Sequence, residues 1–266
     1  YWHPIKLAGE AAMTDLISNG RLEFGIGSGA YQREFDRMFP GLKQSDAWRY
    51  MQESLPAVKA LWKGDYEHKG EFWSFPMSTS VPKPIQDPHP PIWVAARAPI
   101  TYDFAVEHEC NIMSWPLTRP MSEAELYKSR LDEAMEKFPN KPKPIFSMMR
   151  HTAVYENKQD WEIPVKALTK VLGQFENLFK NLDDVENGFP KGIDLKDLQN
   201  RDEYDSLMLQ ENLMFGTPDE VISKLKRYEN LGVDNFIYYA SMGLGHQEQK
   251  KSLKLFCNEV IPAFTQ

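Results

Sequence analysis

Strand-like apolar runs alternate with amphipathic stretches along most of this chain. Helical spacing of apolar residues fills the intervals between the runs, for example at residues 99–109 and 121–138. Strands that are separated by helices pair in parallel, through right-handed crossovers. The alternation therefore predicts an α/β fold built on a parallel sheet, with strands expected at residues 22–26, 92–96, 111–115, 145–155 and 233–240.

Such a sheet can stay open and doubly wound, or it can close into a barrel. The segment Gly25–Gly29 is similar to a nucleotide phosphate loop, but a dinucleotide fingerprint (GxGxxG) needs glycine where Ala30 stands. A polar, aromatic loop is expected at residues 31–35, where the open fold needs a helix. The sequence therefore favours a TIM-type (β/α)8 barrel. With five strand–helix units, it would lack about the first three strands, and a companion segment is expected to complete it.

Glycine and proline interrupt the pattern at three places. Asn19–Gly20 predicts a left-handed stop for a helix at residues 7–17. Pro56 should kink or interrupt a helix at residues 45–62. Residues 73–91 carry six of the 19 prolines, which excludes a helix or a central strand there.

A polar stretch near residue 181 predicts an inserted loop region at about residues 181–213. Such an insertion could act as a lid. Its apolar end could line an adaptable ligand pocket or could simply pack the last helices; this set is Leu207, Met208, Leu209, Leu213, Met214 and Phe215. A helix is then expected to start at Thr217, with Glu220 placed for a capping box.

Composition excludes several classes of protein. Thirty-one basic and 38 acidic side chains give a net charge of −7, which argues against nucleic acid as the main partner. No stretch reaches the roughly 18 to 20 uncharged apolar residues of a membrane span. Cys110 and Cys257 lack metal or redox spacing, so a reduced, cytoplasmic location is expected. No metal-binding motif and no hydrolase nucleophile motif is present in the sequence, so no metal is expected.

In a barrel, functional groups lie at the C-terminal ends of strands. Ser28, between two glycines, could donate to an anion, or the glycines could form only a tight turn. Arg97 and Thr101 flank a helix N-terminus that could cradle phosphate, although Arg97 could instead pair with a surface carboxylate. Trp115, after the third strand, could wall a flat ring or belong to the core.

The sequence contains fewer candidates for general acid–base catalysis than for anion or ring binding. His3 and His246 could face the barrel mouth, His151 lies mid-strand, and the other three histidines are expected to be structural or solvated. The sequence thus offers side chains that could bind a phosphate and a flat ring, but few that could act as acids or bases. This combination indicates that a cofactor supplies the chemistry.

Four segments, in order, resemble the bacterial luciferase-like flavin-dependent monooxygenase family. The likeness spans nearly the whole chain. The matching segments are His3–Tyr31 with its SNGRL and FGIGSG stretches, Pro82–Ala96 with PKPIQ and PPIWVAA, Gly216–Ile222 with GTPDEVI, and Leu255–Pro262.

The resemblance implies one TIM-type barrel domain over residues 1–266 that binds reduced FMN from a separate reductase and uses O2 to oxidise an organic substrate. Some relatives use F420 for hydride transfer instead, and dimers are common in the family. The resemblance implies that the flavin phosphate lies near Ser28, Gly29 and Tyr31, and near Arg97, Ala98 and Thr101, with the ring over Ser114 and Trp115.

The matched segments differ from the family pattern at the phosphate residues. Many members have arginine where Ser28 stands, and a small hydroxylic residue near Ala98. Arg97 could supply the charge that Ser28 does not. His3 is the family-matched histidine of this chain and therefore the candidate catalytic residue.

Three functions remain open. The first is a monooxygenase, expected to be a homodimer like many members of the family, that acts on a small apolar compound such as an aldehyde, a ketone or a hydrocarbon. The second is an F420-dependent oxidoreductase, and the third is a flavin-binding protein without turnover. A phosphate-binding aldolase-like barrel ranks last, because Lys63, Lys69, Lys83 and Lys143 do not stand at strand ends.

Overall fold

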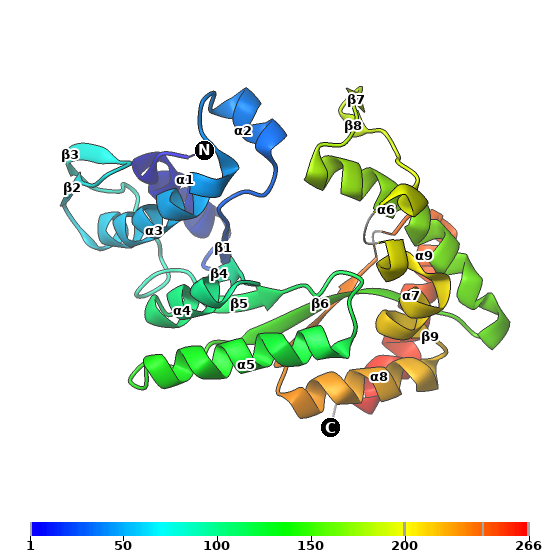
Figure 1. Ribbon diagram of the computed structural model, residues 1–266. Coiled ribbons are helices and arrows are strands. Elements are labelled where there is room, and N and C mark those ends of the chain that lie inside the picture. The colour runs from blue at the N-terminus through cyan, green and yellow to red at the C-terminus, as the bar shows by residue number, and fades with distance from the viewer. Residues whose placement is uncertain (1, 199–200, 241, 265–266) are drawn as a thin grey trace. The chain divides into compact units, whose positions relative to one another are not determined.

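The structure, a computed structural model, describes residues 2–198, 201–240 and 242–264 of the 266-residue chain (Figure 1). The chain divides into two units. The first contains residues 1–112 and 134–144, and the second contains residues 113–133 and 145–266.

The first unit begins with helix α1 (Pro4–Ile17). Pro4 occupies the first helical position, which needs no amide hydrogen, and His3 caps the helix by accepting from the Ile5 amide at 3.3 Å. The buried face of α1 is made of small side chains, including Ala8 and Ala12. The helix ends just before Asn19 and Gly20, both with positive φ, which confirms the predicted stop.

A parallel set of strands follows in this unit. Strand β1 (Phe24–Ile26) pairs with β4 (Ile92–Ala95), and β4 neighbours β5 (Asn111–Ser114) in the sheet. Helix α4 (Pro99–Glu107) follows β4. These strands and this helix lie where the sequence predicts them.

Helix α3 (Ala47–Lys63) runs unbroken through Pro56, so the expected interruption is wrong. Proline removes one amide donor, but the buried face, with Leu55 and Val58, holds the backbone in the helix. The Trp62 indole donates to the carbonyl of Ala8 at 2.9 Å and ties α3 to α1.

The loop expected at residues 31–35 is also wrong, because helix α2 (Gln32–Met38) begins there. Phe35 is buried on its inner side, and the Gln32 side chain accepts from the Gln44 amide at 2.8 Å. Seven residues are too few for a periodic signal, and tertiary contacts of this kind decide such a short helix.

The proline-rich segment carries no helix and no central strand, as predicted. Its strand β3 (Ser74–Ser78) contains Pro76 and pairs only with β2 (Tyr66–Lys69), in an antiparallel hairpin. The buried carboxylate of Asp15 then accepts from the amides of Ile85 and Gln86 at 2.9 and 3.1 Å, which anchors the end of the segment to α1.

Strand β6 (Phe146–Val154) is the centre of the second unit. It pairs in parallel with β10 (Asn235–Tyr239) and with β9 (Met214–Gly216). The sequence did not predict the β9 strand, because its three buried residues show no alternation. The helices that complete this part are α5 (Met121–Lys137), α6 (Glu162–Lys180), α8 (Pro218–Leu231) and α9 (His246–Leu255).

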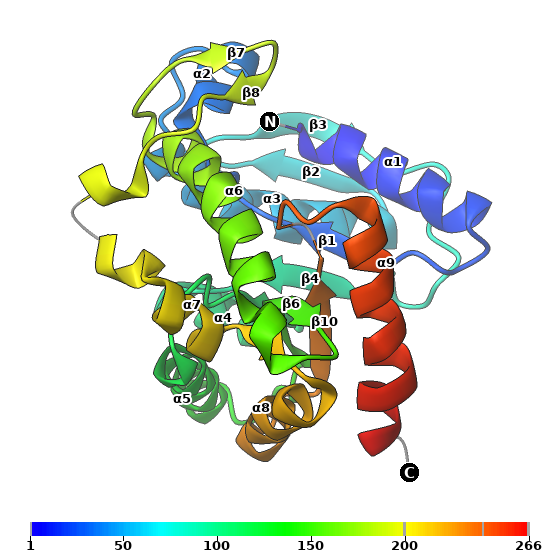
Figure 2. The same ribbon diagram turned by 90° about the vertical axis from the view of Figure 1, so that its right-hand side faces the viewer.

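The ends of these helices follow the sequence signals. Helix α8 has the predicted capping box, and the Thr217 amide donates to Glu220 at 2.9 Å. Helix α9 lies against the strands (Figure 2), where the Ser252 hydroxyl accepts from the Val154 amide at 2.7 Å. A π turn and a 3-10 turn continue α9 to Ala263.

The segment predicted to be an insertion carries small elements: a hairpin of β7 (Val185–Glu186) and β8 (Phe189–Pro190), and helix α7 (Ser206–Asn212). The Asn177 side chain holds the hairpin by accepting from the Asp183 amide at 2.7 Å and donating to the Lys191 carbonyl at 2.8 Å. Leu209, Leu213 and Phe215 are buried in a core cluster with α6. Of the two alternatives that the sequence left open, these three residues therefore follow packing and not pocket lining.

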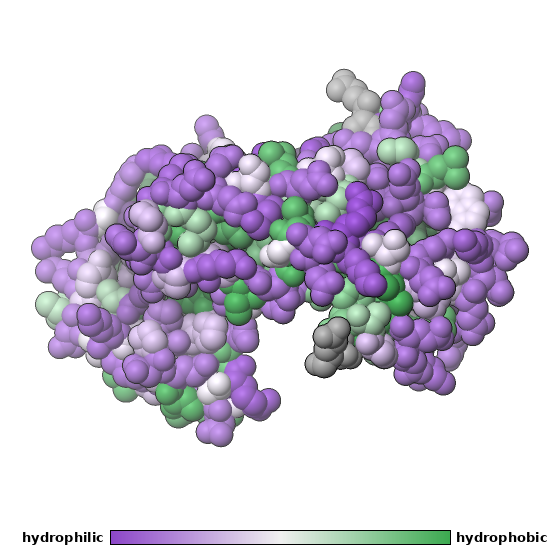
Figure 3. All heavy atoms as spheres, turned by 90° about the horizontal axis from the view of Figure 1, so that it is seen from below, coloured by the Kyte–Doolittle hydropathy of each residue, from purple (hydrophilic) through white to green (hydrophobic). Residues whose placement is uncertain are grey.

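None of the described helices is both long enough and apolar enough to cross a membrane. Figure 3 shows a face covered mostly by hydrophilic residues, with apolar residues in separate patches.

Candidate functional site

Two loops of the first unit begin at the same edge of the sheet. In the parallel register of β1 and β4, Ile26 pairs with Val94. Ser28 and Gly29 follow β1 at this edge, just as Arg97 and Ala98 follow β4. The structure therefore brings the two predicted phosphate-binding segments to neighbouring strand ends.

The loop after β1 is a cross-linked turn. Gly29 has a φ of +88°, a conformation that favours glycine, and its carbonyl accepts from the Gln44 side chain at 3.2 Å. Ser28 is half-buried, and Tyr31 is the residue before α2. The turn thus has a set shape, with the Ser28 hydroxyl as its side-chain donor.

The loop after β4 offers fewer backbone donors than the sequence suggested. Pro99, the first residue of α4, has no amide hydrogen, and the Thr101 amide donates to the Ala98 carbonyl at 2.9 Å. The Thr101 side chain is buried, whereas Arg97 and Ala98 are exposed. Charge at this edge therefore comes from Arg97 more than from the helix N-terminus.

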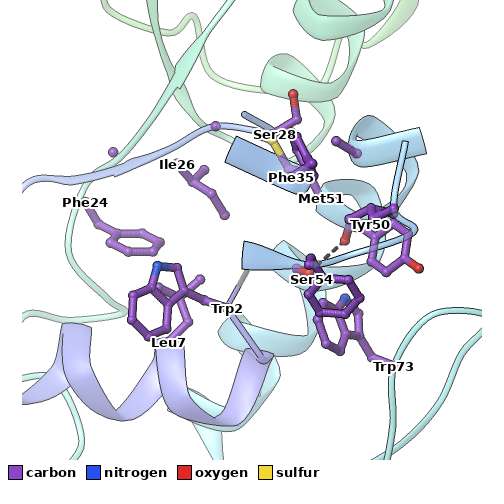
Figure 4. Close-up of a pocket in the computed structure, with 15 residues that line it drawn as sticks. Trp2, Leu7, Phe24, Ile26, Ser28, Phe35, Tyr50, Met51, Ser54 and Trp73 are labelled. Atoms are coloured by element: carbon purple, nitrogen blue, oxygen red, sulfur yellow. Dashed lines mark hydrogen bonds between the residues drawn. The ribbon is translucent and has the colours of Figure 1, made fainter. Parts of the chain in front are cut away.

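An apolar pocket of about 270 Å³ lies beside β1 (Figure 4). Its walls come from β1, α3 and the β2–β3 hairpin, and Ser28 lies at one end of it. None of its lining residues is charged. Sequence reasoning missed this pocket, because its walls are far apart along the chain.

The predicted catalytic residue, His3, does not line this pocket. Its ring packs edge-on against Trp73, a pocket residue, with centroids 5.2 Å apart, and lies 5.5 Å from the ring of Phe75. Its Nδ1 is engaged in the cap of α1. His3 therefore lies directly behind a wall of the pocket.

A carboxylate of α3 holds the turn of the hairpin. Glu53 accepts from the amides of Phe72 and Trp73 at 3.0 and 2.8 Å, and it contacts His68 Nε2 at 2.7 Å. His68 Nδ1 in turn lies 2.8 Å from the Tyr66 hydroxyl. Burial raises the pKa of Glu53, but these hydrogen bonds outweigh it and the net pKa is lowered. Sequence reasoning left His68 as structural and gave no partner for it.

In the second unit, three rings meet around the end of β10. Trp115 follows Ser114, the buried last residue of β5, and its ring lies 5.5 Å from His151 and 5.4 Å from Tyr239. The rings of His151 and Tyr239 are 4.6 Å apart. Trp115 is thus in a cluster of aromatic residues that the sequence did not predict, although alternation along residues 146–154 could have placed His151 on this face.

Two ring nitrogens of this cluster, Trp115 Nε1 and His151 Nδ1, are buried without a hydrogen-bond partner in the described part of the chain. Burial, with a smaller effect of the adjacent Arg150, lowers the pKa of His151 to about 3. His151 is therefore neutral at physiological pH.

The Arg150 side chain holds the loop after Trp115 in position. Its guanidinium is fully buried and donates to the carbonyls of Leu117, Arg119 and Asn212 at 3.0, 2.7 and 2.7 Å. Asn212 returns a hydrogen bond to the Thr118 carbonyl at 3.1 Å. This network joins the β5–α5 loop to the end of α7.

Among residues 2–198, 201–240 and 242–264, no group of three or more histidine, cysteine or acidic side chains is placed to hold a metal ion. The two cysteines are not bonded to each other.

A family profile and a relative of known sequence both indicate the same protein family. The sequence profile of the luciferase-like monooxygenases matches residues 1–235. The oxygenase component of flavin-dependent trigonelline monooxygenase from Acinetobacter baylyi (strain ATCC 33305 / BD413 / ADP1) is 41% identical over 266 residues, which covers 100% of this chain and 74% of that protein.

Solved structures agree on the fold. The monooxygenase RslO1 from Streptomyces bottropensis matches with a TM-score of 0.79 and 23% identity, over 100% of this chain and 75% of that one. An F420-dependent secondary alcohol dehydrogenase, solved with an F420–acetone adduct, matches with a TM-score of 0.74 and 17% identity, over 100% and 76%. These likenesses confirm the predicted α/β fold class, that of the luciferase-like TIM barrels.

Proposed function

The chain belongs to the luciferase-like monooxygenase family, and from this premise we propose that it is the oxygenase component of a two-component monooxygenase that uses reduced FMN and O2. Family membership makes the chain an oxidoreductase. The observation that carries the finer proposal is the 41% identity, along the whole chain, to an oxygenase component named as flavin-dependent.

FMN is proposed over F420 because the sequence identity to a flavin-dependent relative is higher than that to an F420-dependent one. The flavin-dependent relative matches at 41% identity, whereas the F420-dependent dehydrogenase matches at 17%, a level that speaks for the fold alone. The term "oxygenase component" in the relative's name supports a separate, transient flavin reductase as partner. A homodimer and a cytoplasmic location complete the proposal.

Each unit, taken by itself, offers residues that suit one part of a flavin. Arg97 provides the charge for the phosphate, and Ser28 provides a hydroxyl donor at the neighbouring strand end, with Gly29, Tyr31, Ala98 and Thr101 shaping the two loops. In the second unit, Ser114 and Trp115 are proposed to contact the flavin ring. The buried nitrogens without partners near Trp115 fit a heteroaromatic ligand better than an apolar core.

Bound reduced flavin supplies the electrons that activate O2. The protein itself would bind the phosphate through Arg97 and Ser28. Its apolar and aromatic side chains would exclude water from the reaction. His3 remains the proposed catalytic residue. Its Nδ1 accepts from the Ile5 amide, so Nε2 is the atom at which a proton would be held or moved. The proposed substrate is a small apolar compound, such as an aldehyde, a ketone or a hydrocarbon.

Titration with FMN and with riboflavin tests the phosphate site, because the two ligands differ only by the phosphate. Arg97→Met should weaken FMN binding about tenfold, the loss of one charge-assisted contact of ~1.4 kcal/mol or more, and should leave riboflavin unchanged. Arg37→Met, at an exposed arginine of α2, is the matched control.

Equal losses for FMN and riboflavin would overturn the phosphate assignment. Binding of F420 with no binding of FMN, and no O2 consumption with reduced FMN and a reductase, would overturn the proposed function itself.

A further inference from the structure

The pocket beside β1 has the composition of a site for a flat apolar molecule. Figure 4 shows Phe24 and Trp2 on one side of the space, with Tyr50 and Trp73 on the other. Aromatic rings on facing walls favour a planar guest through offset or edge-on contacts. A volume of about 270 Å³ is at the small end of ligand pockets, so the guest is a small molecule.

Charge and hydrogen bonding narrow the class of guest. The lining contains no acidic or basic side chain, and a buried ion without a partner is costly, so the guest is uncharged. The Ser54 hydroxyl is already engaged with the Tyr50 carbonyl at 2.7 Å. Trp73 Nε1, by contrast, is buried without an acceptor in the described chain. Because this nitrogen is closed off from the accessible space, it sets no requirement on the guest, and the ring face of Trp73 is what the pocket offers.

The position of Trp73 depends on Glu53. The two hydrogen bonds from the amides of Phe72 and Trp73 to this carboxylate fix the backbone of the hairpin turn against α3. A Cβ atom on Gly70 would come within 1.8 Å of Glu53 Oε1, so the turn is built closely around the carboxylate. Trp73 also packs against Tyr50, with centroids 5.7 Å apart.

We propose that this pocket binds the organic substrate, that the substrate is an uncharged compound with one small aromatic ring, and that Glu53 is the positioning residue for the Trp73 wall. The proposal rests on the monooxygenase function proposed above. It narrows that function, because the pocket selects for a flat ring and against ions.

Acetophenone and benzoate are matched probes, since both carry one phenyl ring and only benzoate is charged. Calorimetry should detect binding of acetophenone and at least tenfold weaker binding of benzoate. Leu42→Trp, which adds bulk to a half-buried pocket residue in a loop, should reduce acetophenone affinity at least tenfold. Met38→Trp, at an exposed residue outside the pocket, is the matched control and should have no effect.

Glu53→Gln keeps the size of the side chain but replaces one acceptor oxygen with a donor. It should weaken acetophenone binding about tenfold and leave FMN affinity unchanged. It should also alter the near-ultraviolet circular dichroism of the tryptophans, and this change should be absent in a Trp73→Phe background. A purely structural effect would lower FMN and acetophenone affinity together.

The outcomes separate this inference from the proposed function. If FMN binds and supports O2 consumption while Leu42→Trp leaves acetophenone affinity unchanged, or if benzoate binds as well as acetophenone, the pocket assignment is overturned and the function stands. If FMN does not bind while Leu42→Trp abolishes acetophenone binding, the function is overturned and the pocket stands.

Discussion

Replacing Arg150 with methionine should destabilise the second unit by about 3 kcal/mol, an estimate that follows from the number of carbonyls left without a donor. The guanidinium is fully buried and meets three carbonyl oxygens at 2.7 to 3.0 Å. No hydrogen bond to a carboxylate is found for it in the described chain. Carbonyl dipoles, together with the Tyr228 ring 5.9 Å from the guanidinium, therefore compensate the charge.

Two effects of the substitution oppose each other. Methionine removes the cost of burying a charge, which in some proteins makes such replacements neutral or stabilising. Here the three carbonyls, which take part in part-buried hydrogen bonds, would lose their donor, and each polar group left unsatisfied costs about 1–3 kcal/mol. A carbonyl keeps a second lone pair and stands at the lower end of that range, so the sum is about 3 kcal/mol and the loss should dominate.

Urea unfolding of the wild type and of Arg150→Met measures the difference, and the melting temperature should fall by roughly 6–12 °C. Arg227→Met, at an exposed position of α8, is the control and should change stability by less than about 0.5 kcal/mol. An Arg150→Met protein as stable as the wild type would show that desolvation of the guanidinium cancels its hydrogen bonds, and would refute the reasoning.

Two further predictions concern the first unit. Gly70→Ala should cost about 1 to 2 kcal/mol of unfolding free energy, because its Cβ would come within 1.8 Å of Glu53 Oε1 and 2.6 Å of His68 Nε2. The cost should be smaller in a Glu53→Ala background, where the His68 contact is left; equal costs in a double-mutant cycle would exclude Glu53 from the collision. Asp15→Asn should cost about 2 kcal/mol at pH 7 in urea unfolding, because the buried carboxylate accepts from Ile85 and Gln86. Burial raises the pKa of Asp15, but hydrogen bonds lower it below its ordinary value of 3.8 overall. This stabilisation is therefore complete above that value and is lost as the pH falls through the folded-state pKa, so the stability difference between the two proteins should shrink in acid; a constant difference would contradict the assignment.

Local and periodic signals in the sequence predicted the parallel α/β architecture. The apolar runs that became β4, β5, β6 and β10 are long enough for their buried character to be seen without any partner. The stop at Gly20 and the capping box at Thr217 use residues within one turn of the helix end, so they too are visible in the sequence.

Short elements needed the tertiary structure. Strand β9 has three residues and helix α2 has seven, too few for a period, and each is held by contacts from elsewhere, such as the buried Phe35. Pro56 is the converse case. The sequence rule predicts a break, but a well-buried helix face outweighs one lost hydrogen bond.

The candidate site divides in the same way. Apolar runs before Ser28 and Arg97 already show that each residue follows a strand, and parallel pairing then places them at one edge. Three other features depend on long-range contacts: Glu53 holds the turn before Trp73, Arg150 donates to the carbonyl of Asn212, and apolar walls enclose a pocket beside β1. The difference lies in the separation along the chain. Backbone periodicity and helix caps depend on residues a few positions apart, whereas the partners of a buried charge and the walls of a pocket come from residues tens of positions apart.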